Sequence, residues 1–209
     1  RIELIQDGCL YTIHSAAILT HTRVSEQVRM DYLARKIHRP RWSSKSGPGW
    51  SVEDIKADAV TKCLVTSSDK LSMWECDDTE TDVNEIVLAL HNPKTSRCET
   101  MDIVLVRKSD LNARDIMFVV SPDTGDTLFQ DLKSRHVDLV ELSVAKLTYI
   151  ATLIRDSVRI NPPSPNPFLY RVTVGEVRRI MRKAVEAERI RLEDLPEGIQ
   201  VEVSRATPN

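Results

Sequence analysis

The chain has 209 residues, of which 41% are hydrophobic and 29% charged, and its formal net charge is -2. These values are typical of a soluble globular protein that is long enough to bury a substantial core. The nearly balanced charge excludes a global attraction to nucleic acid or to an anionic membrane. Because no apolar run approaches the roughly 20 residues of a membrane span, we expect no membrane association.

The cysteines and glycines argue against the common metal and nucleotide sites. Cys9, Cys63, Cys76 and Cys98 are far apart and form no C-x-x-C pair, so neither a zinc site nor a redox motif is predicted. The glycines form no phosphate-binding loop. We therefore expect no cofactor, and the cysteine usage indicates a reduced, cytoplasmic location.

The first third of the chain is predicted to be mainly helical. Arg1–Ile5 is a possible strand, and Leu10–Ile37 carries apolar residues at helical spacing, ending with Tyr32 and Leu33. Arg39–Gly49 is rich in proline, glycine and serine, which predicts a loop. Ser51, with Asp54 three residues later, predicts the start of a helix that runs to about Leu64.

The middle of the chain predicts a sheet. Lys70–Cys76 alternates as a strand does, and Met101–Val106 and Ile116–Val120 are apolar runs that suit strands buried on both faces. Asp82–His91 has helical spacing and stops at Asn92-Pro93. Because Asp110–Arg114 is too short for a crossover helix, we expect the second and third strands to pair antiparallel.

The last third predicts a central helix, a proline-rich arm and a return to the sheet. Leu139–Ile154 is apolar on more than one side. Asn161–Pro167 holds closely spaced prolines, which favours a linker or extended arm. Thr173 and Glu176 form a capping box that opens a helix to about Ile190. Ile199–Val203 alternates and predicts an edge strand.

Together these patterns predict an α+β fold: a small mixed, partly antiparallel sheet covered by helices, with a helical N-terminal part. Residues 1–160 would form the core domain and residues 161–170 a linker or arm. Residues 171–209 would add a helix and an edge strand that pack on the core.

A basic loop is the most unusual local feature. No acidic residue occurs between Asp31 and Glu53. Arginine pairs with phosphate oxygens and indole offers a stacking face, so such a loop suits nucleic acid or a protein partner. The alternative is a solvated loop whose tryptophans fold back onto the core. The candidate binding residues are Arg35, Lys36, Arg39, Arg41, Trp42, Lys45 and Trp50.

Acidic residues give two further candidates. The cluster in Glu75–Asp82 could hold a divalent metal, but acids before a helix are also expected from its dipole, and we favour that explanation. Asp123 followed by Asp131 and Lys133 weakly matches a metal-dependent nuclease pattern. No catalytic residue or metal ligand is predicted.

The function that we expect is a non-enzymatic protein–protein interaction module of an intracellular assembly. Its contacts would be the Arg35–Trp50 loop and the proline-rich arm, with a protein partner or a second copy. One alternative is a nucleic-acid-binding protein that uses the basic loop. Another is a metal-dependent nuclease or hydrolase that uses one of the acidic groups.

Overall fold

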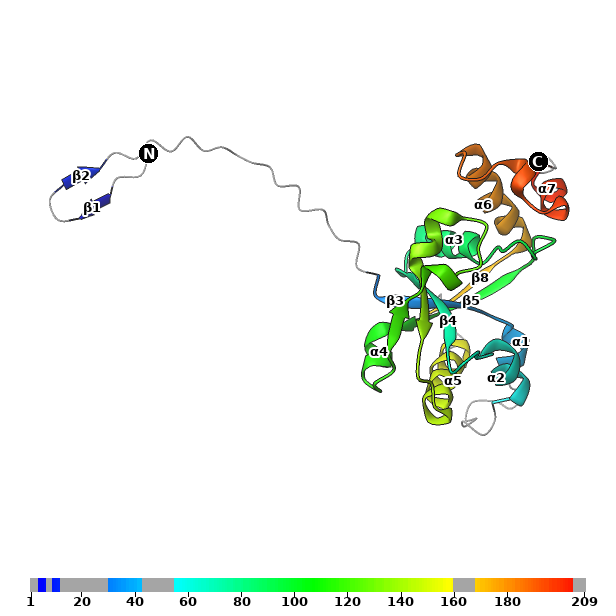
Figure 1. The fold of residues 1–209 in the computed structure, drawn as a ribbon, viewed down its shortest axis with the longest axis horizontal. Helices are drawn as coiled ribbons and strands as arrows, with labels where there is room; N and C mark the ends of the chain where they lie inside the picture. The colour runs from blue at the N-terminus through cyan, green and yellow to red at the C-terminus, as the bar shows by residue number, and fades with distance from the viewer. Residues whose placement is uncertain (1–3, 7–8, 12–29, 43–54, 160–167, 205–209) are drawn as a thin grey trace.

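The computed structural model describes residues 4–6, 9–11, 30–42, 55–159 and 168–204. Its centre is a six-stranded antiparallel sheet with the strand order β6-β7-β4-β3-β5-β8 (Figure 1). A second, two-stranded sheet pairs β1 (Leu4–Gln6) with β2 (Cys9–Tyr11). The six strands are β3 (Tyr32–Ile37), β4 (Leu71–Cys76), β5 (Met101–Arg107), β6 (Phe118–Val120), β7 (His136–Leu139) and β8 (Leu169–Val172). The α+β fold is confirmed, with a sheet that is antiparallel throughout rather than mixed.

The central strand β3 corrects the helix predicted over Leu10–Ile37. Leu33 and Ile37 are both buried in the same core. A spacing of four residues places side chains on one face of a strand as well as of a helix, so this spacing did not separate the two. β2 falls at the other end of the same predicted helix, and residues 12–29 lie outside the described residues.

One face of the sheet is covered by α1 (Arg39–Trp42), α2 (Ala57–Cys63) and α5 (Val144–Arg159) (Figure 1). The short helix α4 (Lys108–Asn112) closes the same core through Leu111. Leu139, predicted as the start of the central helix, ends β7 instead, and α5 begins at Val144. The predicted cap Ser51 lies outside the described residues, and α2 begins at Ala57.

The opposite face is covered by α3 (Glu80–Ala89), α6 (Val174–Glu186) and α7 (Glu197–Ser204) (Figure 1). Apolar residues of all three helices join one core with Trp74, Ile103 and Leu105 of the sheet. The 3-10 turns η2 (Pro122–Thr124) and η3 (Gln130–Arg135) lead into β7, and η4 (Leu192–Asp194) precedes α7.

The helix α7 overturns the edge strand predicted over Ile199–Val203. Ile199 and Val203 are buried, whereas Val201 between them is 46% exposed. That burial follows the helical period of about four residues instead of the strand period of two. Gly198 lets α7 approach closely, because a Cβ atom there would lie 2.1 Å from the carbonyl oxygen of Ser96.

Several local predictions are confirmed. β4, β5 and α3 lie where the alternation and spacing indicated, and Thr173 with Glu176 forms the predicted capping box of α6. The expected pairing of β5 with β6 is wrong, because β6 pairs with β7 and α4 intervenes. β8 begins inside the range predicted as a linker, and residues 160–167 lie outside the described residues.

Candidate functional site

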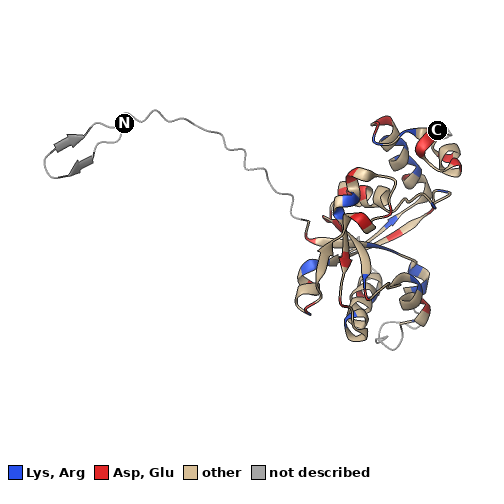
Figure 2. Ribbon diagram, in the orientation of Figure 1, with Lys and Arg blue, Asp and Glu red and all other residues tan. Residues whose placement is uncertain are grey.

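The structure spreads the candidate residues of the basic loop over two elements. Arg35 and Lys36 lie on β3, and Arg39, Arg41 and Trp42 lie on α1. Lys45 and Trp50 lie outside the described residues. Charges of both signs are distributed over the described part of the chain (Figure 2).

Trp42 and Arg35 are both engaged within the chain. Trp42 is 1% exposed and belongs to the core beneath α1, so its indole offers no stacking face to a base. Arg35 Nε donates to the carbonyl oxygen of Cys63 at 2.7 Å, and its Nη1 donates to the carbonyl oxygen of Ser72. Desolvation lowers the pKa of the Arg35 guanidinium to about 10, against the raising effect of Cys63.

Two acidic residues of the Glu75–Asp82 cluster form ion pairs within the chain. Glu75 pairs with Lys108, and Asp82 with Arg135 and the backbone N–H of Asp77. Thr79 caps α3, and Glu80 and Asp82 lie in its first turn, which confirms the capping explanation.

The residues that matched a nuclease pattern lie on different elements. Asp123 lies in η2, whereas Asp131 accepts a hydrogen bond of 2.6 Å from Arg189. Within the described residues, no group of three or more histidine, cysteine, aspartate or glutamate side chains is arranged to hold a metal ion.

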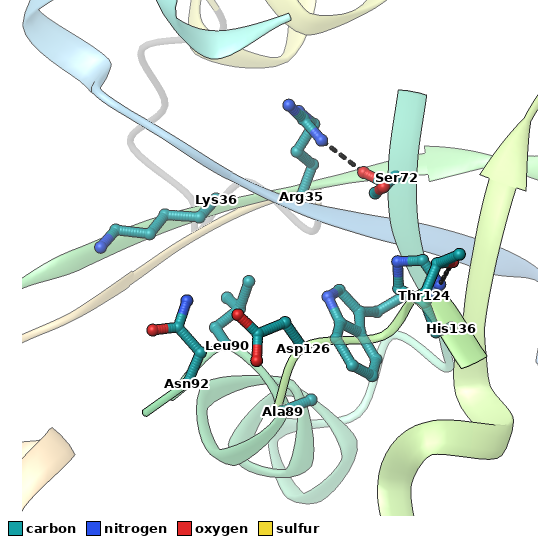
Figure 3. Close-up of a pocket in the computed structure, with 10 residues that line it drawn as sticks. Arg35, Lys36, Ser72, Ala89, Leu90, Asn92, Thr124, Asp126 and His136 are labelled. Atoms are coloured by element: carbon teal, nitrogen blue, oxygen red, sulfur yellow. Dashed lines mark hydrogen bonds between the residues drawn. The ribbon is translucent and has the colours of Figure 1, made fainter. Parts of the chain in front are cut away.

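A pocket of about 310 Å³ opens where β3 and β4 separate. These strands pair only from Tyr32 to Ala34, and beyond Ala34 the Arg35 guanidinium bridges the gap to Ser72. In Figure 3 the Arg35 side chain lies on the opposite side of β3 from Leu90, Asn92 and Asp126. The residues that line the pocket are Arg35, Lys36, Ser72, Trp74, Ala89, Leu90, Asn92, Thr124, Asp126 and His136.

His136 forms one wall of this pocket and is held in one orientation. It is buried, and its Nδ1 lies 2.9 Å from the carbonyl oxygen of Ser121. Because a carbonyl can only accept, Nδ1 is the donor in this contact. The Trp74 ring meets the imidazole edge-on at 5.0 Å between centroids, and Gly125 packs against both residues.

Asp138 accepts hydrogen bonds from hydroxyl groups near His136. Ser72 donates to one carboxylate oxygen at 2.9 Å and Thr124 to the other at 3.2 Å. Burial opposes ionisation of Asp138. Hydrogen bonds from Ser121, Ser72 and Thr124, with the nearby imidazole, nevertheless lower its pKa overall.

This polar network suits binding better than nucleophilic catalysis. The hydroxyl groups of Ser72 and Thr124 are hydrogen-bonded to a carboxylate, and the hydroxyl groups of Ser121 and Thr124 that approach His136 contact Nδ1. A serine or threonine nucleophile needs a base that accepts its proton. The arrangement instead fixes the position of the imidazole at the pocket wall.

A second surface feature is the outer strand β6. Its residues Phe118–Val120 and the preceding Met117 are apolar, and Met117, Val119 and Val120 are 48%, 52% and 54% exposed. The sequence predicted a strand there, but one buried on both faces. The pocket wall was also missed, because His136 and Asp138 alternate with Val137 and Leu139 over only four residues.

Comparison with protein-family models, curated proteins and solved structures gives no match. Function is therefore inferred from the geometry of the chain itself. Among the described helices, none is both long and apolar enough to cross a membrane.

Proposed function

We propose that this chain is a non-enzymatic interaction protein that associates with a second copy of itself along β6. The observation that carries the proposal is the apolar edge of β6 at one side of the six-stranded sheet, on which no other strand pairs among the described residues. Exposed strand edges are surfaces onto which another strand can add.

On the outer side of β6, backbone groups are unpaired within the part of the chain that the structure describes. Ser121 N–H donates to His136 and Val140 N–H donates to Met117, so the residues of odd number in this segment pair with β7. In an antiparallel ladder the intervening residues point their N–H and C=O groups the other way. Phe118 and Val120 therefore direct both of their backbone groups to the free edge.

The side chains along this edge favour association. The segment Ile116–Ser121 (IMFVVS) carries no charged residue. Charged side chains are a common means by which proteins protect edge strands from pairing, and β6 lacks this protection. An uncharged segment can also approach an identical copy without repulsion between like charges.

Symmetry defines one register for the pair. If two copies of β6 pair antiparallel about a twofold axis at Val119, Phe118 of each copy faces Val120 of the other. All four outward backbone groups of each strand then form hydrogen bonds, and the two Val119 residues form the non-hydrogen-bonded pair. A strand of three residues buries far less than the about 1,600 Å² of a standard interface, so we expect a weak, reversible dimer.

Disulfide formation by Val119→Cys tests this register. The two Cα atoms would lie about 4.5 Å apart in such a pair, within the range that a disulfide spans. We expect rapid formation of a covalent dimer on mild oxidation. Val144→Cys is the matched control, because Val144 is 84% exposed and belongs to α5 instead of β6. Equal crosslinking of the two variants would contradict the proposal.

Sedimentation of the unmodified chain gives an independent test. The fraction of dimer should rise with protein concentration, and Val119→Lys should abolish it by placing two like charges on the axis. Val144→Lys should sediment like the original chain. A chain that stays monomeric at every concentration would overturn self-association along β6.

A further inference from the structure

We infer that the pocket between β3 and α3 binds a small organic cation that carries an ammonium or guanidinium group. This site is separate from the β6 edge and does not depend on the proposed dimer. A volume of about 310 Å³ is within the range of small-molecule pockets.

Asp126 supplies the negative charge. Its carboxylate lines the pocket and is exposed, and among the described residues it forms no hydrogen bond or ion pair. Figure 3 shows it beside Leu90 and Asn92, below β3. A carboxylate in such a position attracts a cation and can accept hydrogen bonds from its N–H groups.

The two basic residues of the lining are already engaged. Lys36 forms an ion pair with Glu99, which offsets its charge. Arg35 directs its donors to the carbonyl oxygens of Cys63 and Ser72, on the other side of β3 (Figure 3). Neither cation therefore competes with a ligand for Asp126.

The remaining polar surroundings also favour positive charge. Ala89 ends α3 and Leu90 caps it, so the negative end of the helix dipole lies at the pocket. Leu90 and the Trp74 ring provide apolar surface for the carbon chain of the ligand.

Calorimetry with agmatine, which has an ammonium group at one end and a guanidinium group at the other, tests the inference. Glutarate, a flexible molecule with an anionic group at each end, is the probe of opposite charge. We expect heat of binding with agmatine and none with glutarate at the same ionic strength. Absence of agmatine binding, or equal binding of glutarate, would overturn the inference.

A matched pair of variants locates the site. Asp126→Asn keeps the shape of the side chain and removes its charge, so agmatine affinity should fall at least about tenfold, or 1.4 kcal/mol. Asp123→Asn removes an exposed carboxylate three residues away that does not line the pocket, and it should leave affinity unchanged. Equal losses in the two variants would indicate only general charge attraction, which contradicts the assigned pocket. The far-UV circular dichroism of each variant checks that it is folded.

Discussion

Arg35 on β3 donates a hydrogen bond of 2.7 Å from Nε to the carbonyl oxygen of Cys63, the last residue of α2. Its Nη1 donates to the carbonyl oxygen of Ser72 on β4, where the ladder between β3 and β4 has ended. The Arg35 guanidinium thus links β3 to β4 where their backbone hydrogen bonds have ended, and it also links β3 to α2.

Replacing Arg35 with methionine should destabilise the fold by about 2–3 kcal/mol, because two carbonyl groups lose a charged donor. Arg35→Lys should give a smaller loss, since an ammonium group lacks the forked geometry needed to reach both oxygens. Urea unfolding measures the change as a lower midpoint at constant slope. Arg41→Met on α1 is the control, with an expected change within about 0.5 kcal/mol. An Arg35→Met protein as stable as this control would rule out the bridging role.

Substitution by alanine should change the stability of the protein in opposite directions at two glycines, each of which is the second residue of a helix. In α7, Gly198→Ala would place Cβ 2.1 Å from the carbonyl oxygen of Ser96, which forces α7 away from the core. We expect a loss of about 1–3 kcal/mol or more. In α6, the nearest atom to the new Cβ of Gly175→Ala is Thr173 Oγ1 at 4.0 Å. That variant should gain about 0.5–1 kcal/mol from the higher helix propensity of alanine. The melting temperatures of both variants, compared with that of the original chain, test this prediction. Shifts of the same sign would contradict the close approach of α7.

Stability should fall as the pH is lowered from neutral, because of His91. Burial lowers the pKa of His91 below its ordinary value of 6.5, and Lys36 adds to this effect, although the hydrogen bond to Val87 and the charge of Glu99 oppose it. Below pH 6.5 the unfolded chain therefore binds a proton that the folded chain excludes, so the free energy of unfolding decreases as pH falls toward the folded pKa.

The variant His91→Phe should flatten this part of the pH profile. At neutral pH it should cost about 1 kcal/mol, because the hydrogen bond of 2.7 Å between Nδ1 and the Val87 carbonyl is lost. This cost should shrink as the pH falls, because only the original chain then loses stability through the histidine. His38→Phe removes an exposed histidine and should leave the slope unchanged. Urea midpoints measured between neutral pH and about pH 5 provide the comparison. The same slope in His91→Phe and the original chain would exclude His91 as the source.

The helices and strands that were predicted correctly are those with a clear pattern in their own sequence. The alternation of Lys70–Cys76, the apolar run Met101–Val106 and the capping box at Thr173 could each be recognised without knowledge of a distant partner. Strand β3 was missed because Leu33 and Ile37 suit either period. Strand β7 was missed because His136 and Asp138 are polar residues that become buried through hydrogen bonds with Ser121, Thr124 and Ser72.

The candidate sites depended on strand order, which local patterns do not encode. The apolar run Ile116–Val120 predicted a buried strand, but β6 lies beyond β7 at the end of the described strand order, with exposed Val119 and Val120. The pocket likewise joins Lys36, Asn92, Asp126 and His136 from segments far apart in the chain. No short motif could have brought these residues together.

Because β3 lies between β4 and β5, the integrity of the sheet depends on one short strand. That strand is far in sequence from the two strands that it pairs with. Tyr32–Ile37 is the sole described link between a subset made of β6, β7 and β4 and a subset made of β5 and β8. Proteolytic removal of all residues up to Ile37 would divide the sheet into two parts. The edges of β4 and β5 that pair with β3 would then be exposed and unpaired. Such a fragment should aggregate instead of refolding, which makes intact residues 32–37 a requirement for recombinant truncations of this protein.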